Sequence, residues 1–169
     1  MNKNIKRLLC FVLFVGFFLT FSCAPRVSEK SYFAENPTFD LLISYQHSPF
    51  KDRIVSKLIE KYQGFANIDV VGISTLKNLS CDGYDAIVIM DTCKAWSFFN
   101  FSMKSFIKKS TNCNNLILFM TAGDPEWTYR YKSLDAVTSA SSVGEEDRVV
   151  GELTGRIDQK ISLISDIKS

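Results

Sequence analysis

The feature that most constrains the fold is a series of short apolar runs, separated by segments of different pattern. The runs occupy residues 41–45, 68–73, 84–90, 115–121 and, more weakly, 136–139. Near-continuous runs of Val, Ile and Leu are typical of strands that are covered on both faces, as in a parallel sheet. The sequence therefore predicts five strands in one sheet.

Segments with helical periodicity lie between several of these runs. The apolar positions that predict the first helix are Ile54, Val55, Leu58, Ile59 and Tyr62. A second helix, ending near Ser110, is predicted by Phe99, Met103, Phe106 and Ile107. Residues 74–83 leave room for a short helix at most. Residues 142–145 match a capping box, and a closing helix is predicted by Val149, Val150, Leu153, Ile157, Ile161 and Ile164.

Strands that alternate with helices predict an α/β fold, a three-layer doubly wound five-stranded parallel sheet with helices on both faces. In such a sheet a ligand binds outside the carboxyl ends of the strands, at the point where the strand order reverses. We therefore expect a site formed by the turns at residues 46–51, 91–99 and 121–127.

The N-terminus has the pattern of an export signal. Lys3, Lys6 and Arg7 precede an apolar stretch at residues 8–19, which is too short to span a bilayer. The ending LTFSC resembles the lipobox of bacterial lipoproteins, which predicts a signal peptide at residues 1–22 and a lipid on Cys23. An ordinary cleaved signal and a retained anchor are the alternatives. The protein is expected to be exported and lipid-anchored to the bacterial cell membrane or outer membrane.

Removal of residues 1–22 would change the net charge from +2 to −1, because three of the 20 basic residues and none of the 18 acidic ones lie there. A nearly neutral chain gives no electrostatic reason to expect nucleic acid as a partner. Residues 23–38 are polar and contain two prolines, which predicts a tether. Residues 39–166 then form the folded domain.

Three cysteines remain in that domain, namely Cys81, Cys93 and Cys113. Their spacing matches neither a zinc site nor a CxxC redox motif. One disulfide with one free thiol is possible in an oxidising compartment. The interpretation favoured by the sequence is three buried, unpaired cysteines.

Three stretches together form a recognisable pattern, namely YDAIVIM (84–90), FSMKSFIKK (101–109) and NNLILFMTAG (114–123). Through them the chain resembles flavodoxins and related flavin-binding domains from about residue 39 to 164. The resemblance implies FMN as cofactor, with its phosphate in the turn after the first strand. That turn usually contains glycine and hydroxyl residues, and here only Ser48 matches. Pro49 lacks an N–H donor and Phe50 is bulky, whereas Lys51 could bind the phosphate by charge and Asp52 opposes it.

The other two turns fit the resemblance better. Trp96 stands where flavodoxins often place an aromatic ring against the flavin, and Thr121 to Gly123 resemble the small-residue turn after the fourth strand. Trp127 or Tyr129 could supply a second stacking face. The alternative for Trp96 and Trp127 is that they cap the edge of the sheet.

Three functions follow as hypotheses. The first is an FMN-binding electron carrier or oxidoreductase with a redox partner. The second is a cofactor-free flavodoxin-like binding or interaction module of the cell envelope, with an envelope protein as partner. The third is a hydrolase that uses His47, Asp91 and Asp124, although a lone histidine and such carboxylates are more typical of loops and helix caps.

Overall fold

The computed structural model describes residues 26–93, 101–110, 113–123, 130–131, 134–142 and 144–168. Five parallel strands form the centre of its sheet, in the order β3-β2-β4-β5-β7. Their bounds are Phe39–Tyr45 for β2, Ala66–Gly72 for β3, Ala86–Thr92 for β4, Leu116–Ala122 for β5 and Leu134–Ala140 for β7. Numbered as parallel strands this order is 2-1-3-4-5, the flavodoxin-like order. The predicted fold class is confirmed.

The sheet is wider than the five strands that were predicted. Strand β1 (Lys30–Tyr32) pairs antiparallel with β3, and the two-residue strand β6 (Arg130–Tyr131) pairs antiparallel with the start of β7. Strand β1 lies inside the segment for which a tether was predicted. Its polar residues gave no strand pattern, because a three-residue edge strand is defined by its pairing and has too little apolar surface of its own.

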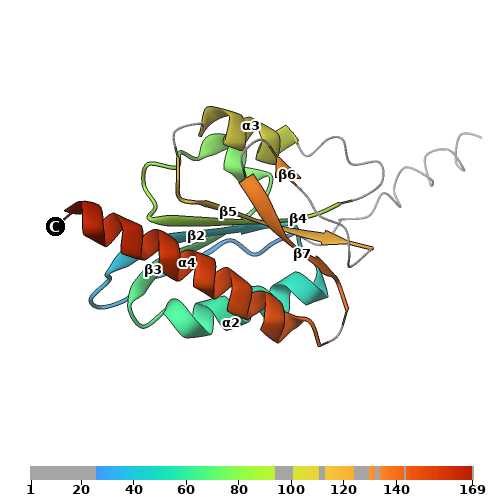
Figure 1. Cartoon of the computed structure of the whole chain (residues 1–169), viewed down its shortest axis with the longest axis horizontal. Helices are drawn as coiled ribbons and strands as arrows, with labels where there is room; N and C mark the ends of the chain where they lie inside the picture. The colour runs from blue at the N-terminus through green and yellow to red at the C-terminus, as the bar shows by residue number, and fades with distance from the viewer. Residues whose placement is uncertain are drawn as a thin grey trace, which may run out of the picture.

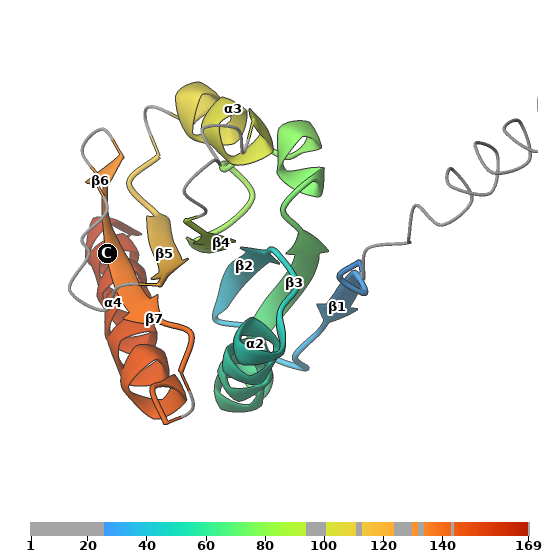
Figure 2. The ribbon, with the colours of Figure 1, turned by 90° about the vertical axis from the view of Figure 1, so that its right-hand side faces the viewer.

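The helices form two layers, one on each face of the sheet (Figure 1). Helices α2 (Pro49–Tyr62) and α4 (Glu146–Lys168) cover one face, while α3 (Phe101–Lys109) and the 3-10 helix η1 (Thr75–Asn78) cover the other (Figure 2). The short helix between β3 and β4 and the three longer helices agree with the predicted pattern. Helix α2 begins earlier than its apolar pattern, at a proline that suits the first helical position.

The apolar residues of the strands alternate between the two faces. In β4, Val88 and Met90 belong to the core under α2 and α4, whereas Ile87 and Ile89 belong to the core under α3. Successive side chains of a strand point to opposite faces, so Thr92 continues the α2 side and Asp91 the α3 side. This alternation decides which polar groups meet at the end of the sheet.

Helix α4 buries the face that the sequence predicted. Val149, Leu153 and Ile157 are fully buried. The predicted capping box at residues 142–145 is wrong, because the chain turns at Gly144 with φ 98° and the helix begins only at Glu146. The Glu146 carboxylate accepts the Gly144 N–H at 2.8 Å.

The carboxylate of Glu146 also joins α4 to α2. It accepts from Arg53 Nη2 at 2.7 Å. Hydrogen bonding to its own backbone N–H, then to Arg53 and Gly144, lowers the pKa of Glu146 below its usual value. Lys57 with Asp147 and Lys61 with Asp158 continue the ion pairs along the two helices. The first turns of α2 and α4 are therefore fixed side by side near the carboxyl end of the sheet.

A disulfide joins Cys81, before β4, to Cys113, before β5. The interpretation of all three cysteines as unpaired is therefore wrong for these two, while Cys93 has a free thiol. The cause is topological, because β4 and β5 are adjacent parallel strands and their preceding turns meet at the same edge. The Cα atoms lie 6.4 Å apart although 32 residues separate the cysteines.

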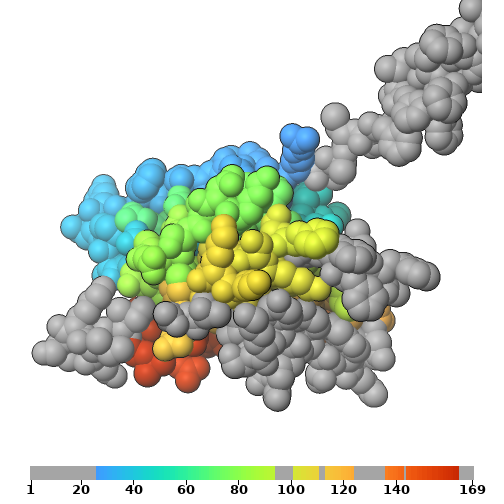
Figure 3. Space-filling model, turned by 90° about the horizontal axis from the view of Figure 1, so that it is seen from above, coloured from blue at the N-terminus to red at the C-terminus, as the bar shows by residue number. Residues whose placement is uncertain are grey.

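Seen from the α3 side, the N-terminal segment lies along the region that follows β3 (Figure 3). The helices and strands named above, and both core clusters, lie within the described residues. Among the described residues, no helix combines the length and the apolar character needed to cross a membrane.

Candidate functional site

The candidate site lies at the carboxyl ends of β2 and β4, where the order of the parallel strands reverses. After β2 the chain enters α2 through Gln46, His47 and Ser48. Ser48 is the N-cap, with extended backbone, and its Oγ accepts the N–H of Lys51 at 3.3 Å. The Ser48 hydroxyl, which was predicted to contact a phosphate, therefore caps the first turn of α2.

Lys51 is fully buried. Its side chain extends from the start of α2, which follows β2, to the end of β4. There Nζ donates to Thr92 Oγ1 at 2.5 Å. Thr121, at the end of β5, donates from its Oγ1 to Thr92 Oγ1 at 3.1 Å. We call Lys51, Thr92 and Thr121 the switch-point network. It joins α2, β4 and β5 by side-chain hydrogen bonds at the place where a ligand of this fold would lie.

Three of the predicted flavin-binding residues, Ser48, Lys51 and Thr121, thus lie together at the carboxyl ends of the strands. Gly123 follows β5 at the same end of the sheet. It is exposed, and a Cβ atom added there would meet no atom within 4 Å. Their role in binding FMN stays a prediction. Trp96, Trp127, Tyr129, Asp124 and Cys23 lie outside the described residues.

His47 is bound to a carboxylate that the sequence did not assign to it. Its Nδ1 lies 3.2 Å from Asp52, in the first turn of α2. Asp91, which the hydrolase hypothesis joined to His47, is buried, and by strand alternation it lies on the α3 face. The carboxylate within hydrogen-bonding distance of His47 is therefore that of Asp52 and not that of Asp91.

Tyr45 also contacts Asp52, so that Tyr45, His47 and Asp52 form one cluster. Burial, followed by a hydrogen bond to Asp52, raises the pKa of Tyr45 to about 12. A carboxylate that accepts from both a tyrosine and a histidine holds the two rings in fixed positions. Asp52 therefore positions Tyr45 and His47, and its opposition to an anion at the helix start stays a prediction.

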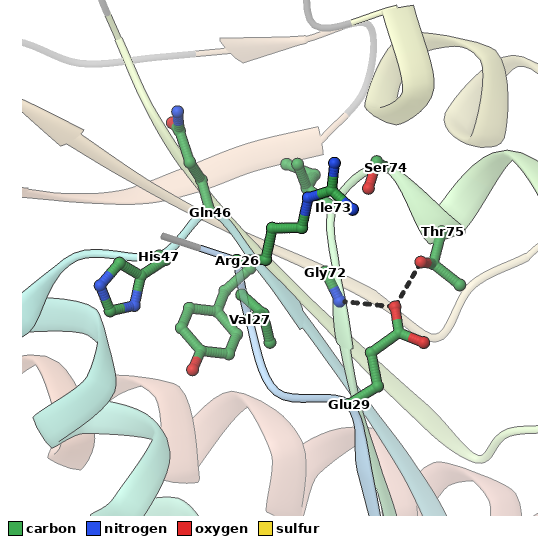
Figure 4. Close-up of a pocket in the computed structure, with 10 residues that line it drawn as sticks. Arg26, Val27, Glu29, Gln46, His47, Gly72, Ile73, Ser74 and Thr75 are labelled. Atoms are coloured by element: carbon green, nitrogen blue, oxygen red, sulfur yellow. Dashed lines mark hydrogen bonds between the residues drawn. The ribbon is translucent and has the colours of Figure 1, made fainter. Parts of the chain in front are cut away.

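A pocket of about 590 Å³ opens at the carboxyl ends of β2 and β3. Gln46 and His47 line it after β2, and Ile73 and Ser74 line it after β3 (Figure 4). Arg26, Val27 and Glu29, which precede β1, line its outer side. Nothing in the sequence signalled this pocket, because its outer wall comes from the segment predicted as a tether.

The pattern of the sequence also missed Thr92 and Asp52 as structural partners. Thr92 ends an apolar run and is followed by a cysteine and a lysine, so only the strand register reveals that it lies beside Thr121. The signal for Asp52 is its distance of five residues from His47, which matters only once α2 is known to begin at Pro49.

No family model matches this sequence, and no curated protein matches it. One solved structure to which it is similar is the crystal structure of oxidised Flavodoxin 2 from Bacillus cereus. The two chains are 12% identical, with a TM-score of 0.44, and the match covers 72% of this chain and 99% of that chain.

Proposed function

We propose that this protein is a lipid-anchored binding module of the bacterial cell envelope, with a flavodoxin-like fold that holds no flavin at the reversal of strand order. The observation that supports it is the burial of Lys51. Its ammonium group is buried and donates to Thr92 inside the protein.

The helix start offers little else to a phosphate. Pro49 has no N–H, and the N–H of Lys51 is taken by Ser48. A phosphate at a helix N-terminus depends on such backbone donors. One donor that is lacking and one that is already used at this helix start support a flavodoxin-like fold that does not hold the FMN phosphate.

Flavin titration tests this proposal. With the chain from Ala24 onward, we expect no flavin to co-purify and no micromolar, saturable quenching of FMN fluorescence. The decisive variant is Gly123→Asp, which places a negative charge at the predicted flavin site without a steric conflict. Gly64→Asp is the matched control, because Gly64 is equally unobstructed and lies between α2 and β3.

Two results separate the alternatives. If FMN binds to the unmodified chain and to Gly64→Asp but not to Gly123→Asp, flavin occupies the predicted site and the proposal is wrong. In that case the protein is better described as an electron carrier or an oxidoreductase. If none of the three chains quenches FMN, the cofactor-free module is supported.

The membrane anchor is tested separately. Cys23→Ser is expected to abolish incorporation of labelled fatty acid and to release the domain from the membrane fraction, because the sulfur of Cys23 would carry the lipid. Cys10→Ser is the control, since Cys10 lies within the proposed signal peptide and should leave labelling unchanged. Labelling that persists in Cys23→Ser would contradict a lipid at this position.

A further inference from the structure

The pocket beside β2 has walls from three parts of the chain. The turns after β2 and β3 form its inner side, and residues 26–29 form its outer side (Figure 4). Its volume, about 590 Å³, lies within the range of roughly 300–1,000 Å³ that is typical of small-molecule sites. A site of this size suits a metabolite of modest size better than a peptide.

Glu29 holds the outer wall in place. Its Oε1 accepts the hydroxyl of Thr75 at 2.5 Å and the N–H of Gly72 at 3.4 Å. These bonds connect the N-terminal segment to the end of β3 and the start of η1. The carboxylate of Glu29 therefore fixes the outer wall of the pocket to the turn after β3.

Arg26 supplies the positive charge of the pocket. It forms no ion pair with any other described residue. Figure 4 shows its side chain lying across the pocket, with the guanidinium group toward Ser74. A guanidinium group beside a hydroxyl is a suitable pair of donors for a carboxylate or a phosphate.

His47 forms the opposite part of the lining, and Asp52 fixes its orientation. Because Asp52 takes Nδ1, the nitrogen that is left for a ligand is Nε2. Val27 and Ile73 add apolar surface between the polar groups. The lining thus combines one cation, a hydroxyl and an oriented imidazole with a short apolar wall.

We propose that this pocket binds a small organic anion, with its carboxylate or phosphate held by Arg26 and Ser74 and its remaining part against Val27 and Ile73. The inference rests on the proposed function, because a binding module that holds no flavin needs another ligand.

His47 allows a direct test, since it is the only histidine of the chain and its ring protons are a unique NMR signal. The probes are acetate, inorganic phosphate and glycerol 3-phosphate, with glycerol as the uncharged control. We expect saturable shifts of the His47 signals with at least one anion and none with glycerol. A response to acetate alone would identify a carboxylate site, and a response to the phosphates alone a phosphate site.

Arg26→Gln is expected to weaken the binding at least tenfold, because a charge-assisted hydrogen bond is lost. Ser74→Ala should weaken it less. Arg148→Gln is the matched control, since Arg148 is an exposed arginine of α4 that pairs with Glu145 and Glu152 and does not line the pocket. Absence of any saturable shift, or equal affinity in Arg26→Gln and the unmodified chain, would overturn the assignment.

The same samples separate this inference from the proposed function. FMN itself carries a phosphate, so FMN binding that is lost in Arg26→Gln and displaced by glycerol 3-phosphate belongs to the pocket. FMN binding that is unaffected by Arg26→Gln but lost in Gly123→Asp contradicts the proposed function. If neither FMN nor the anions bind, the proposed absence of flavin stands and the pocket assignment alone fails.

Discussion

Lys51→Ala is expected to lower the free energy of unfolding by about 2–5 kcal/mol, the usual cost of truncating a long, fully buried side chain. The substitution removes the side chain that fills the space between α2 and the end of β4, and it takes a donor from Thr92. Both effects reduce stability. The truncation leaves a cavity where the Lys51 side chain was packed, and the Thr92 hydroxyl loses a hydrogen bond. Urea unfolding of the two chains measures the difference.

Lys57→Ala is the matched control for this prediction. Lys57 lies on the same helix, but its partner Asp147 is exposed, so its loss should change the stability by less than about 1 kcal/mol. Lys51→Met separates packing from charge, because methionine restores most of the volume without the ammonium group. We expect Lys51→Met to be more stable than Lys51→Ala. Equal stability of Lys51→Ala and Lys57→Ala would mean that the Lys51 side chain lies in solvent.

Removal of the disulfide is expected to have an effect of similar size. For a loop with a sequence separation of 32 residues, loss of the bond between Cys81 and Cys113 should lower the free energy of unfolding by about 3–4 kcal/mol. The double variant Cys81→Ala/Cys113→Ala tests this by urea unfolding. Cys93→Ala is the control, because it removes a free thiol and closes no loop.

A reducing agent provides a second measurement on the same proteins. It should destabilise the unmodified chain and leave the double variant unchanged. Identical unfolding of the unmodified chain with and without reductant would mean that the cysteines are unpaired, as the sequence alone suggested. A disulfide in turn agrees with export, because such bonds persist in oxidising compartments.

The fold was predictable because its signals are local. Each parallel strand is a short apolar run, and the apolar face of α4 repeats at helical spacing over several turns, so Leu153 and Ile157 identify themselves as core residues. The handedness of βαβ units then places helices on both faces of the sheet, while the strand order was implied by the resemblance to flavodoxins. The boundaries were less accurate, as at Glu146, where the backbone of Gly144 decides the start of the helix.

The site was less predictable because its contacts join distant parts of the chain. A lysine in a polar turn is ordinarily exposed, and only the position of α2 beside the end of β4 brings Lys51 to Thr92. The disulfide depends on the pairing of β4 with β5. Arg26 was assigned to a tether by composition, and its place in the pocket follows from the pairing of β1 with β3.

Strand β1 also limits how far the domain can move. Because β1 begins at Lys30 and Arg26 already lines the pocket, only Ala24 and Pro25 lie between Arg26 and Cys23. The three steps from Cys23 to Arg26 reach about 10 Å when the chain is fully extended. With a lipid on Cys23, as proposed, the domain would be held close to the membrane surface. The mouth of the pocket would then face the lipid headgroups. A soluble partner would then approach from the opposite end, where the disulfide lies.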